Sequence, residues 1–191
     1  MDDTPWYRPA ALDGILADAA AQGFAMSCED RTGSLLGTLA ASQPGGQIVE
    51  LGTGVGAGAA WLLHGMDSTA RLTTVEMDPH SQAVAVRHLG EDPRVTFHNM
   101  NADRWLDGYD GPLLDLVYVD CRPGKFRRMG DLLTLMRPGG IYLVDDLMPQ
   151  ATWPADHQPR VDKFLEQLPG IPNFTSTALR WASGLVIGVR I

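Results

Sequence analysis

Lysine is nearly absent from this chain of 191 residues, where only Lys125 and Lys163 occur. Acidic residues outnumber basic ones by 23 to 15, which gives a formal net charge of -8. A chain with this charge and so few ammonium groups is poorly suited to binding the phosphate backbone of a nucleic acid. We therefore expect no nucleic-acid partner.

Cysteine is also scarce, because Cys28 and Cys121 are too few for a disulfide scaffold or a structural zinc site. No apolar run approaches the roughly 18 residues of a membrane-spanning helix. The first five residues contain two aspartates and no basic residue, where a signal peptide needs a basic start. These features predict a cytoplasmic protein without a membrane partner.

Hydrophobic residues make up 45% of the chain and charged residues 20%, which is typical of a folded domain. We expect one domain over residues 1–191, with N-terminal helices in residues 1–45 that pack over a cofactor site. Apolar periodicity and turn residues predict helices over 12–21, 30–41, 56–66, 79–89, 102–106, 127–136 and 160–168. Strands are expected over 47–51, 71–76, 94–98, 114–119, 141–144, 174–179 and 185–189.

This alternation of strands and helices predicts an α/β fold of the Rossmann-like, doubly wound type. Its seven-stranded sheet should be mostly parallel, carry helices on both faces and end in an antiparallel strand pair. Residues 114–119 and 141–144 are almost wholly apolar, as expected of covered central strands. Ligands of such sheets bind at the carboxyl ends of the strands.

A glycine-rich loop follows the first predicted strand. Its glycines are Gly52, Gly54, Gly56 and Gly58. Glycine lets the backbone turn sharply and lets a ligand approach closely, and the next helix offers free N–H groups. The loop lacks the Gly-Lys-Ser/Thr of a P-loop. Ala57 departs from the Gly-x-Gly-x-x-Gly spacing, which weakens the case for NAD.

Two glutamates end the first two predicted strands. Glu50 precedes the glycine loop and favours a ligand with a positive group. Glu76 follows Gly56 by 20 residues, near the position from which a carboxylate accepts the hydroxyls of a ribose. Together with the loop, they indicate a nucleoside with a cationic tail, which is the chemistry of S-adenosylmethionine.

The segment from Val49 to Gly56, Val-Glu-Leu-Gly-Thr-Gly-Val-Gly, resembles motif I of class I methyltransferases. Over about residues 24–191 the chain is similar to the small O-methyltransferase family of catechol and caffeoyl-CoA methyltransferases, and closest to its compact bacterial branch. The resemblance implies cofactor contacts from a set of residues beyond the glycine loop. They are Met26 over the methionine part, Met77 against adenine, Ala102 and Asp103 at the adenine edge, and Asp120.

Three aspartates end two central strands, namely Asp120, Asp145 and Asp146. Short carboxylates that converge at one sheet edge suit Mg²⁺, Ca²⁺ or Mn²⁺. The resemblance implies a metal bound by an Asp and an Asp-Asn pair, so Asp146 stands where the family has Asn. The alternative is that Asp145 and Asp146 cap a turn and Asp120 touches only the cofactor.

Methyl transfer also needs a base. The family places a lysine three residues after the first metal Asp, whereas Lys125 comes five residues after Asp120. Lys125 is the first candidate base, and His157 in the long loop 146–160 is the second. Trp153 in that loop could stack on an aromatic substrate, while Cys121 is expected to line the pocket.

The leading hypothesis is an S-adenosylmethionine-dependent O-methyltransferase that acts on a small phenolic or catechol-like acceptor with a divalent metal. One alternative is a metal-independent methyltransferase that acts on nitrogen or another atom. The others are an NAD-dependent oxidoreductase and a non-catalytic cofactor-binding module. A homodimer is expected to be possible, because the short N-terminal helices leave the acceptor site open.

Overall fold

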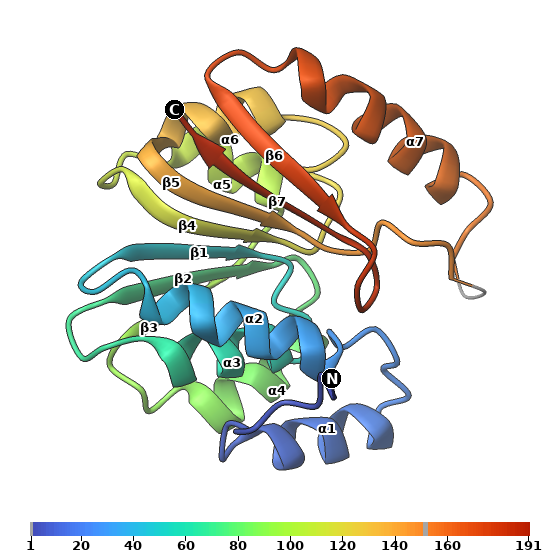
Figure 1. Ribbon diagram of the computed structural model, residues 1–191. Coiled ribbons are helices and arrows are strands. Elements are labelled where there is room, and N and C mark those ends of the chain that lie inside the picture. Colours follow the sequence, from blue (N-terminus) through green and yellow to red (C-terminus); the bar gives the residue numbers. More distant parts are fainter. Residues whose placement is uncertain (1, 151–152) are drawn as a thin grey trace.

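The computed structural model describes residues 2–150 and 153–191. Ala151 and Thr152, part of the long loop expected over residues 146–160, lie outside the described residues. Helices and strands alternate along most of the chain (Figure 1). The helices are α1 (Leu12–Ala21), α2 (Asp30–Ala41), α3 (Ala57–Gly65), α4 (Pro79–Leu89), α5 (Ala102–Gly108), α6 (Met129–Leu135), α7 (His157–Gln167) and the 3₁₀ turn η1 (Leu168–Gly170). The strands are β1 (Gln47–Leu51), β2 (Arg71–Glu76), β3 (Val95–Asn99), β4 (Leu114–Val119), β5 (Met136–Val144), β6 (Phe174–Leu179) and β7 (Leu185–Arg190).

The strands form one seven-stranded sheet in the order β3-β2-β1-β4-β5-β7-β6. The first five in this order run parallel, and β7 pairs antiparallel with both β5 and β6. The chain reverses its direction of winding between β1 and β4, so a crevice opens where these two strands end. The predicted fold class is confirmed.

Apolar side chains cover the sheet on both faces. Helices α1 to α4 pack on one face around Trp61, Leu72 and Leu116. Helices α5 to α7 pack on the other around Val117 and Phe164. The functional groups are therefore left at the carboxyl edge of the parallel strands, where the helices do not cover the sheet (Figure 1).

The structure differs from the expected elements mainly around β5. This strand begins at Met136 rather than Ile141, because Met136 pairs with Leu114 before the register shifts. The Arg137 side chain is paired with Asp115 at that shift. Helix α7 begins at His157 rather than Arg160, which brings His157 close to the end of β5. No helix among the described residues is long and apolar enough to cross a membrane.

Candidate active site

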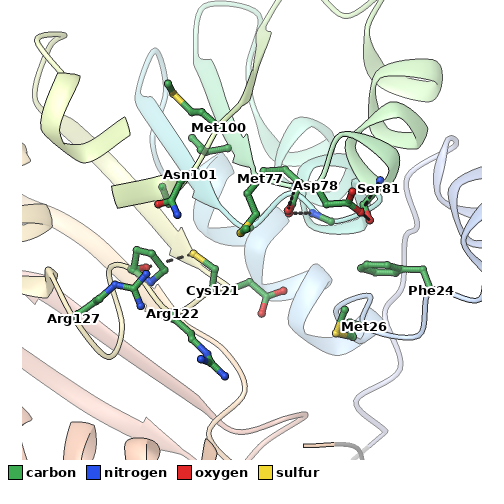
Figure 2. A pocket seen from close by; sticks show the side chains of 17 residues that line it. Phe24, Met26, Met77, Asp78, Ser81, Met100, Asn101, Cys121, Arg122 and Arg127 are labelled. Carbon is green, nitrogen blue, oxygen red and sulfur yellow. Dashed lines mark hydrogen bonds between the residues drawn. The ribbon is translucent and has the colours of Figure 1, made fainter. Parts of the chain in front are cut away.

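A cavity of about 390 Å³ lies at the carboxyl ends of β1, β2 and β4. This volume falls in the range of about 300–1,000 Å³ that is typical of small-molecule sites. Figure 2 shows Met77 and Asn101 on one side and Cys121 and Arg122 on the other. Phe24 lines the cavity from the segment between α1 and α2. Thus the segment after α1, rather than the N-terminal helices themselves, reaches the site.

The glycine-rich loop forms the floor of this cavity. Gly52, Gly54 and Gly56 all have positive φ, a backbone conformation that other residues rarely adopt. A Cβ at Gly52 would lie 2.6 Å from the main-chain oxygen of Asp120. A Cβ at Gly58 would lie 2.3 Å from Oε1 of Glu50. The loop therefore needs glycine both to turn and to pack tightly.

Glu76 holds the loop from the end of β2. Its Oε2 accepts a hydrogen bond of 2.9 Å from the N–H of Gly54, and its Oε1 accepts one of 2.9 Å from the N–H of Asp78. The side chain is half-buried and faces the cavity. Carboxylate oxygens have further lone pairs, so Glu76 can still accept the hydroxyls of a ribose.

Glu50 is more deeply buried, since only 1% of its surface is exposed. Its Oε2 accepts a hydrogen bond of 2.5 Å from Thr74. Burial raises the pKa of Glu50 to about 8, against the lowering effect of the Thr74 hydroxyl. Glu50 lines a second, smaller cavity, together with Ser27 and Tyr118. In that cavity the buried Oγ of Ser27 has no hydrogen-bond partner, so a polar group is open to a ligand.

Two methionines expected at the cofactor lie on the cavity wall. Met26 and Met77 are 75% and 70% exposed, although both line the cavity. Ala102 lines it as well and begins α5 beside Asn101, whose Oδ1 caps the helix through the N–H of Asp103. A ligand with an apolar face would remove both methionine side chains from water. This favours a ligand ring packed against Met26 and Met77.

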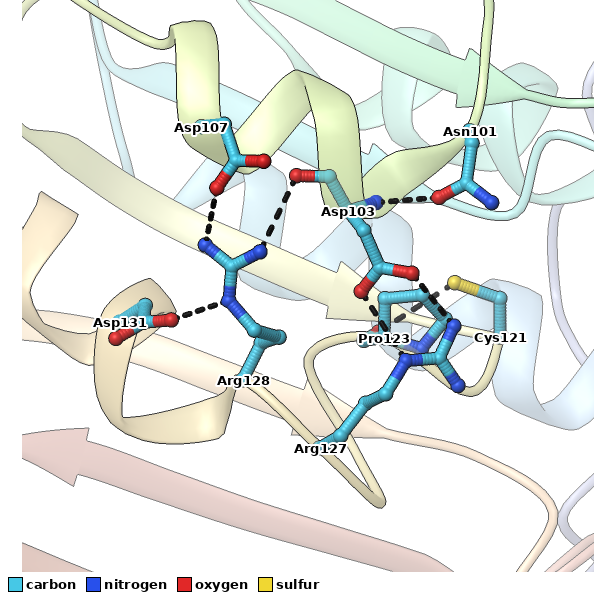
Figure 3. A network of polar contacts seen from close by, with 8 residues as sticks. All are labelled: Asn101, Asp103, Asp107, Cys121, Pro123, Arg127, Arg128 and Asp131. Carbon is cyan, nitrogen blue, oxygen red and sulfur yellow. Dashed lines mark hydrogen bonds and ion pairs between the residues drawn. The ribbon is translucent and has the colours of Figure 1, made fainter.

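Asp103, expected at the adenine edge, is placed differently. Its carboxylate forms two hydrogen bonds with Arg127, from Nε at 3.1 Å and from Nη2 at 2.6 Å (Figure 3). These bonds, with Arg127 the largest cause, lower the pKa of Asp103. Arg127 lines the cavity, whereas Asp103 does not. Asn101 and Arg127 line the cavity at this edge, and Arg127 is a residue that the sequence motifs did not single out.

The three aspartates expected to bind a metal lie near one another, but their carboxylates are oriented differently. Asp120 lines both cavities, but Asp145 is turned into the protein and is 2% exposed. Its Oδ2 accepts a hydrogen bond of 2.9 Å from Tyr118. Its Oδ1 accepts from Ser183 and from the N–H of Asp146. Among residues 2–150 and 153–191, no group of three His, Cys, Asp or Glu side chains has an arrangement that could hold a metal ion. The carboxyl groups present do not fit a divalent cation.

The environment of these aspartates nonetheless disfavours their ionised forms. Burial raises the pKa of Asp120 well above its ordinary value, and the charges of Asp145 and Asp146 add to the effect. Burial likewise raises the pKa values of Asp145 and Asp146. The positive charge of Lys125 opposes the shift at Asp120 and at Asp146.

Both residues expected as bases lie beside Asp146. Lys125 is buried, and its Nζ donates a hydrogen bond of 2.8 Å to the main-chain oxygen of Asp145. His157 Nε2 lies 3.5 Å from the main-chain oxygen of Asp146. Burial and the Lys125 charge lower the pKa of His157. The Trp153 ring, expected to stack on a substrate, lies against His157 with ring centroids 3.9 Å apart.

The fold is a Rossmann-like α/β domain whose cavity lies at the switch point of the sheet. Residues 49–147, more than half of the chain, match the family described as "Methyltransferase domain". The chain belongs to this family, and the predicted enzyme class, an S-adenosylmethionine-dependent methyltransferase, is confirmed.

Relatives of similar sequence bear a more specific name. The chain is 30% identical over 164 residues to a "Putative O-methyltransferase" of Mycobacterium sp. (strain KMS), over 75% of this chain and 74% of that protein. It is 32% identical over 117 residues to one of Mycolicibacterium vanbaalenii, over 59% of this chain but 52% of that protein. The second match thus spans about half of the relative's length.

Solved structures share the fold at lower identity. The O-methyltransferase of Bacillus cereus in complex with SAH superposes with a TM-score of 0.86 at 22% identity and covers 99% of this chain and 94% of that one. The O-methyltransferase TomG of Streptomyces achromogenes, in complex with SAM, superposes with a TM-score of 0.84 at 23% identity. This match covers 96% of the present chain and 91% of TomG.

Proposed function

We propose that this enzyme binds S-adenosylmethionine in the cavity and transfers its methyl group to a hydroxyl oxygen of a small aromatic acceptor. One observation carries the proposal. The cavity over the glycine loop and Glu76 adjoins a smaller cavity that contains a buried carboxyl, Glu50, and an unpartnered hydroxyl, Ser27. This arrangement suits a nucleoside with an amino-acid tail.

The cavity residues fit the parts of this cofactor. Glu76 would accept the ribose hydroxyls, and Met77 with Ala102 would contact the adenine ring. The amino-acid tail would reach Ser27 and Glu50. A cationic amine beside Glu50 would favour the ionised carboxylate and so lower the raised pKa of Glu50. The tail and Glu50 would therefore stabilise each other.

When bound, the cofactor supplies an electrophilic methyl group on a sulfonium. The chain must then orient the acceptor and remove its hydroxyl proton. His157 is the acceptor of that proton in our proposal, because burial favours the neutral imidazole. Since Nε2–H faces the main-chain oxygen of Asp146, the ring nitrogen with a free lone pair is Nδ1. The Trp153 ring, which lies against His157, would form one wall for an aromatic acceptor.

The reaction that we propose does not use a divalent cation. The Asp145 carboxylate is buried and is oriented into the protein by Tyr118, Ser183 and the N–H of Asp146, which leaves Asp120 and Asp146 as the remaining carboxylates. Two carboxylates are fewer protein ligands than the metal site expected from the sequence.

The homodimer and the cytoplasmic location stay predictions. Sedimentation analysis tests whether the protein is a homodimer.

Calorimetric titration tests the cofactor, with S-adenosylhomocysteine and NAD⁺ as the two ligands. We expect binding of S-adenosylhomocysteine and none of NAD⁺. The reverse result would favour an oxidoreductase, and binding of S-adenosylhomocysteine without any methyl transfer would favour a non-catalytic cofactor-binding module. A methyl-transfer screen then compares phenols, catechols and amines. Methylation of amines alone would contradict the hydroxyl acceptor.

A further inference from the structure

Two arginines line the cavity, and their side chains are bound to different degrees. Arg127 is held by Asp103 through two hydrogen bonds, of 3.1 Å and 2.6 Å. Within residues 2–150 and 153–191, the Arg122 side chain forms no hydrogen bond, and its one ion pair joins Nη2 to Oδ1 of Asp156 over 3.8 Å. The guanidinium of Arg122 therefore keeps its N–H donors open at the cavity.

Asp156 is bound more closely by another arginine. Its Oδ2 accepts hydrogen bonds from Nε and Nη2 of Arg160, at 3.0 Å and 2.9 Å, at the start of α7. The 3.8 Å from Arg122 to the other oxygen exceeds hydrogen-bond distance. The side chains of Arg122 and Asp156 are 47% and 51% exposed, so water screens their attraction. An anionic ligand can thus replace Asp156 at Arg122 with little loss of stabilisation.

Arg122 lies on the side of the cavity that faces the loop after β5. Figure 2 shows its side chain directed away from Met77 and Met100, which line the opposite wall. Its partner Asp156 directly precedes His157, the base in our proposed function. The guanidinium therefore lies beside the segment that carries this base.

Aromatic rings lie next to His157. Phe126, from the same loop as Arg122, meets the His157 ring edge-on with centroids 5.2 Å apart, and the Trp153 ring lies 3.9 Å from it. An acceptor whose hydroxyl points at His157 would have these rings beside its own ring. The arrangement suits a flat acceptor with an anionic group that reaches Arg122.

The other charges of the cavity wall make such a cation necessary for an anionic acceptor. Glu76, Asp78 and Asp120 line the cavity, and the chain has a net charge of -8, so an anion is repelled unless a cation receives it. Arg127 is already paired, which leaves Arg122 as the arginine of this wall with donors for a ligand. A planar guanidinium matches a carboxylate through two parallel N–H···O bonds.

We propose that Arg122 selects hydroxylated aromatic acids as acceptors: their carboxylate binds the Arg122 guanidinium in place of Asp156, while a ring hydroxyl faces His157. The methyl group passes from the sulfonium sulfur to the hydroxyl oxygen, the hydroxyl proton passes to His157, and the carboxylate stays unchanged. This inference rests on the proposed function and names its substrate class. Arg122 is then a specificity-determining residue.

Matched acceptors test the proposal on the wild-type protein. Protocatechuate is compared with its amide and caffeate with its methyl ester, because each pair differs only at the carboxylate. We expect kcat/KM to be about 10- to 100-fold higher for the acids, the range that hydrogen bonds to a charged group supply, with most of the difference in KM. Equal values within each pair would overturn the proposal, as would methyl esters of the acids among the products.

Substitution of Arg122 is the second test. Arg122→Gln should lower kcat/KM for the acids by about 10- to 100-fold and change it by less than about twofold for the neutral acceptors. Arg122→Lys, which keeps the charge but not the planar fork, should lie between. Since the ion pair is exposed, the melting temperature should stay at the wild-type value. An equal loss for acids and neutral acceptors would contradict a role in selection.

Arg87 provides the matched control. It is exposed on α4, pairs with Asp18 and does not line the cavity, so Arg87→Gln makes the same change of charge elsewhere. This variant should keep the wild-type preference for acids. A loss of the preference in Arg87→Gln as large as that in Arg122→Gln would assign it to the net charge of the chain and overturn the proposal.

Removal of the competing carboxylate should act in the opposite direction. Asp156→Asn leaves Arg122 without its ion-pair partner and should lower KM for the acids by about two- to threefold, with the neutral acceptors unchanged. A higher KM for the acids alone would contradict the replacement of Asp156 by the carboxylate of the acceptor.

Binding without turnover separates this inference from the proposed function. Calorimetry on the complex with S-adenosylhomocysteine should show tighter binding of protocatechuate than of its amide, and no such difference for Arg122→Gln. Methylation of all four acceptors at equal rates would overturn the selection by Arg122 and leave the proposed function intact. Methylation of none of them would instead strike the hydroxyl acceptor of the proposed function, and this inference with it.

Discussion

The two halves of the carboxyl edge are built by different means. At β1 and β2, main-chain geometry shapes the half that holds the cofactor in our proposal, through the positive φ of Gly52 and Gly54 and the hydrogen bonds from N–H groups to Glu76. At β4 and β5, side chains from distant parts of the chain shape the half around Asp145 and Lys125, where we propose that the acceptor binds. Carboxylates therefore have different roles in the two halves. The carboxylate of Glu76 faces the cavity and can bind a ligand, whereas the buried carboxylate of Asp145 is hydrogen-bonded within the protein and supports the fold.

Removal of the Asp145 carboxylate should have the largest effect on stability. Asp145→Ala leaves the donors of Tyr118, Ser183 and the Asp146 N–H without an acceptor in a buried place. At about 1–3 kcal/mol for each of these orphaned donors, we expect a loss of about 3–9 kcal/mol in the free energy of unfolding. Urea unfolding measures it.

The neighbouring carboxylate is the matched control. Asp146 has a φ of 61°, so Asp146→Asn keeps a side chain that tolerates this conformation. We expect a loss of less than about 1 kcal/mol, typical of a change that creates no buried unpaired group. Equal effects of the two variants would show that Asp145 is not the supporting member of the pair.

The contrast explains what the sequence predicts well. Strand and glycine patterns are local, so β1, the loop at residues 52–58 and the position of Glu76 follow from a short window of sequence. The orientation of Asp145 depends on Tyr118 and Ser183, which are 27 and 38 residues away in the chain. No local pattern reports such partners, and for this reason three aspartates at strand ends resembled a metal site.

Glu50 should make stability fall as pH rises. Its pKa is about 8 in the folded protein against 4.5 as the ordinary value, so the folded state retains a proton that the unfolded state loses. This contribution is complete below pH 4.5 and disappears by about pH 8. At about 1.4 kcal/mol for each pKa unit, it amounts to roughly 5 kcal/mol.

Glu50→Gln isolates this effect, because glutamine keeps the shape of the protonated acid and does not titrate. Unfolding free energies at a series of pH values should fall less steeply for the variant than for the wild type between pH 5 and 8. Saturating S-adenosylhomocysteine should reduce the difference, since a bound ammonium favours the ionised carboxylate. Parallel curves for variant and wild type would place the pH dependence elsewhere.

Glu76 should matter more for binding than for folding. Glu76→Ala removes the acceptor for the N–H groups of Gly54 and Asp78 and, in our proposal, for the ribose. We expect a loss of about 1–3 kcal/mol in S-adenosylhomocysteine affinity, measured by calorimetry. Glu76→Gln, which keeps one acceptor oxygen, should lose less. Unchanged affinity in both variants would remove Glu76 from the cofactor site.

The pairing of Arg127 with Asp103, like the orientation of Asp145, does not follow from local sequence. The family resemblance places Ala102 and Asp103 at the adenine edge, and α5 begins at these residues. The partner that draws Asp103 away from the cavity comes from 24 residues further along the chain. A motif can thus place a residue at the correct edge of the sheet while a distant arginine decides where its carboxylate points.

Asp103→Ala should have the smallest effect on binding, although the family resemblance placed Asp103 beside Glu76 among the cofactor contacts. Its carboxylate is committed to Arg127, in an ion pair whose partners are 29% and 47% exposed. Water screens such a pair, so we expect a stability loss of about 0.2–1 kcal/mol. Because Arg127 lines the cavity and is released in the variant, cofactor affinity should change by less than it does in Glu76→Ala. Calorimetry on both variants decides between the two acids: a larger loss for Asp103→Ala would mean that the Asp103 carboxylate leaves Arg127 when the cofactor binds.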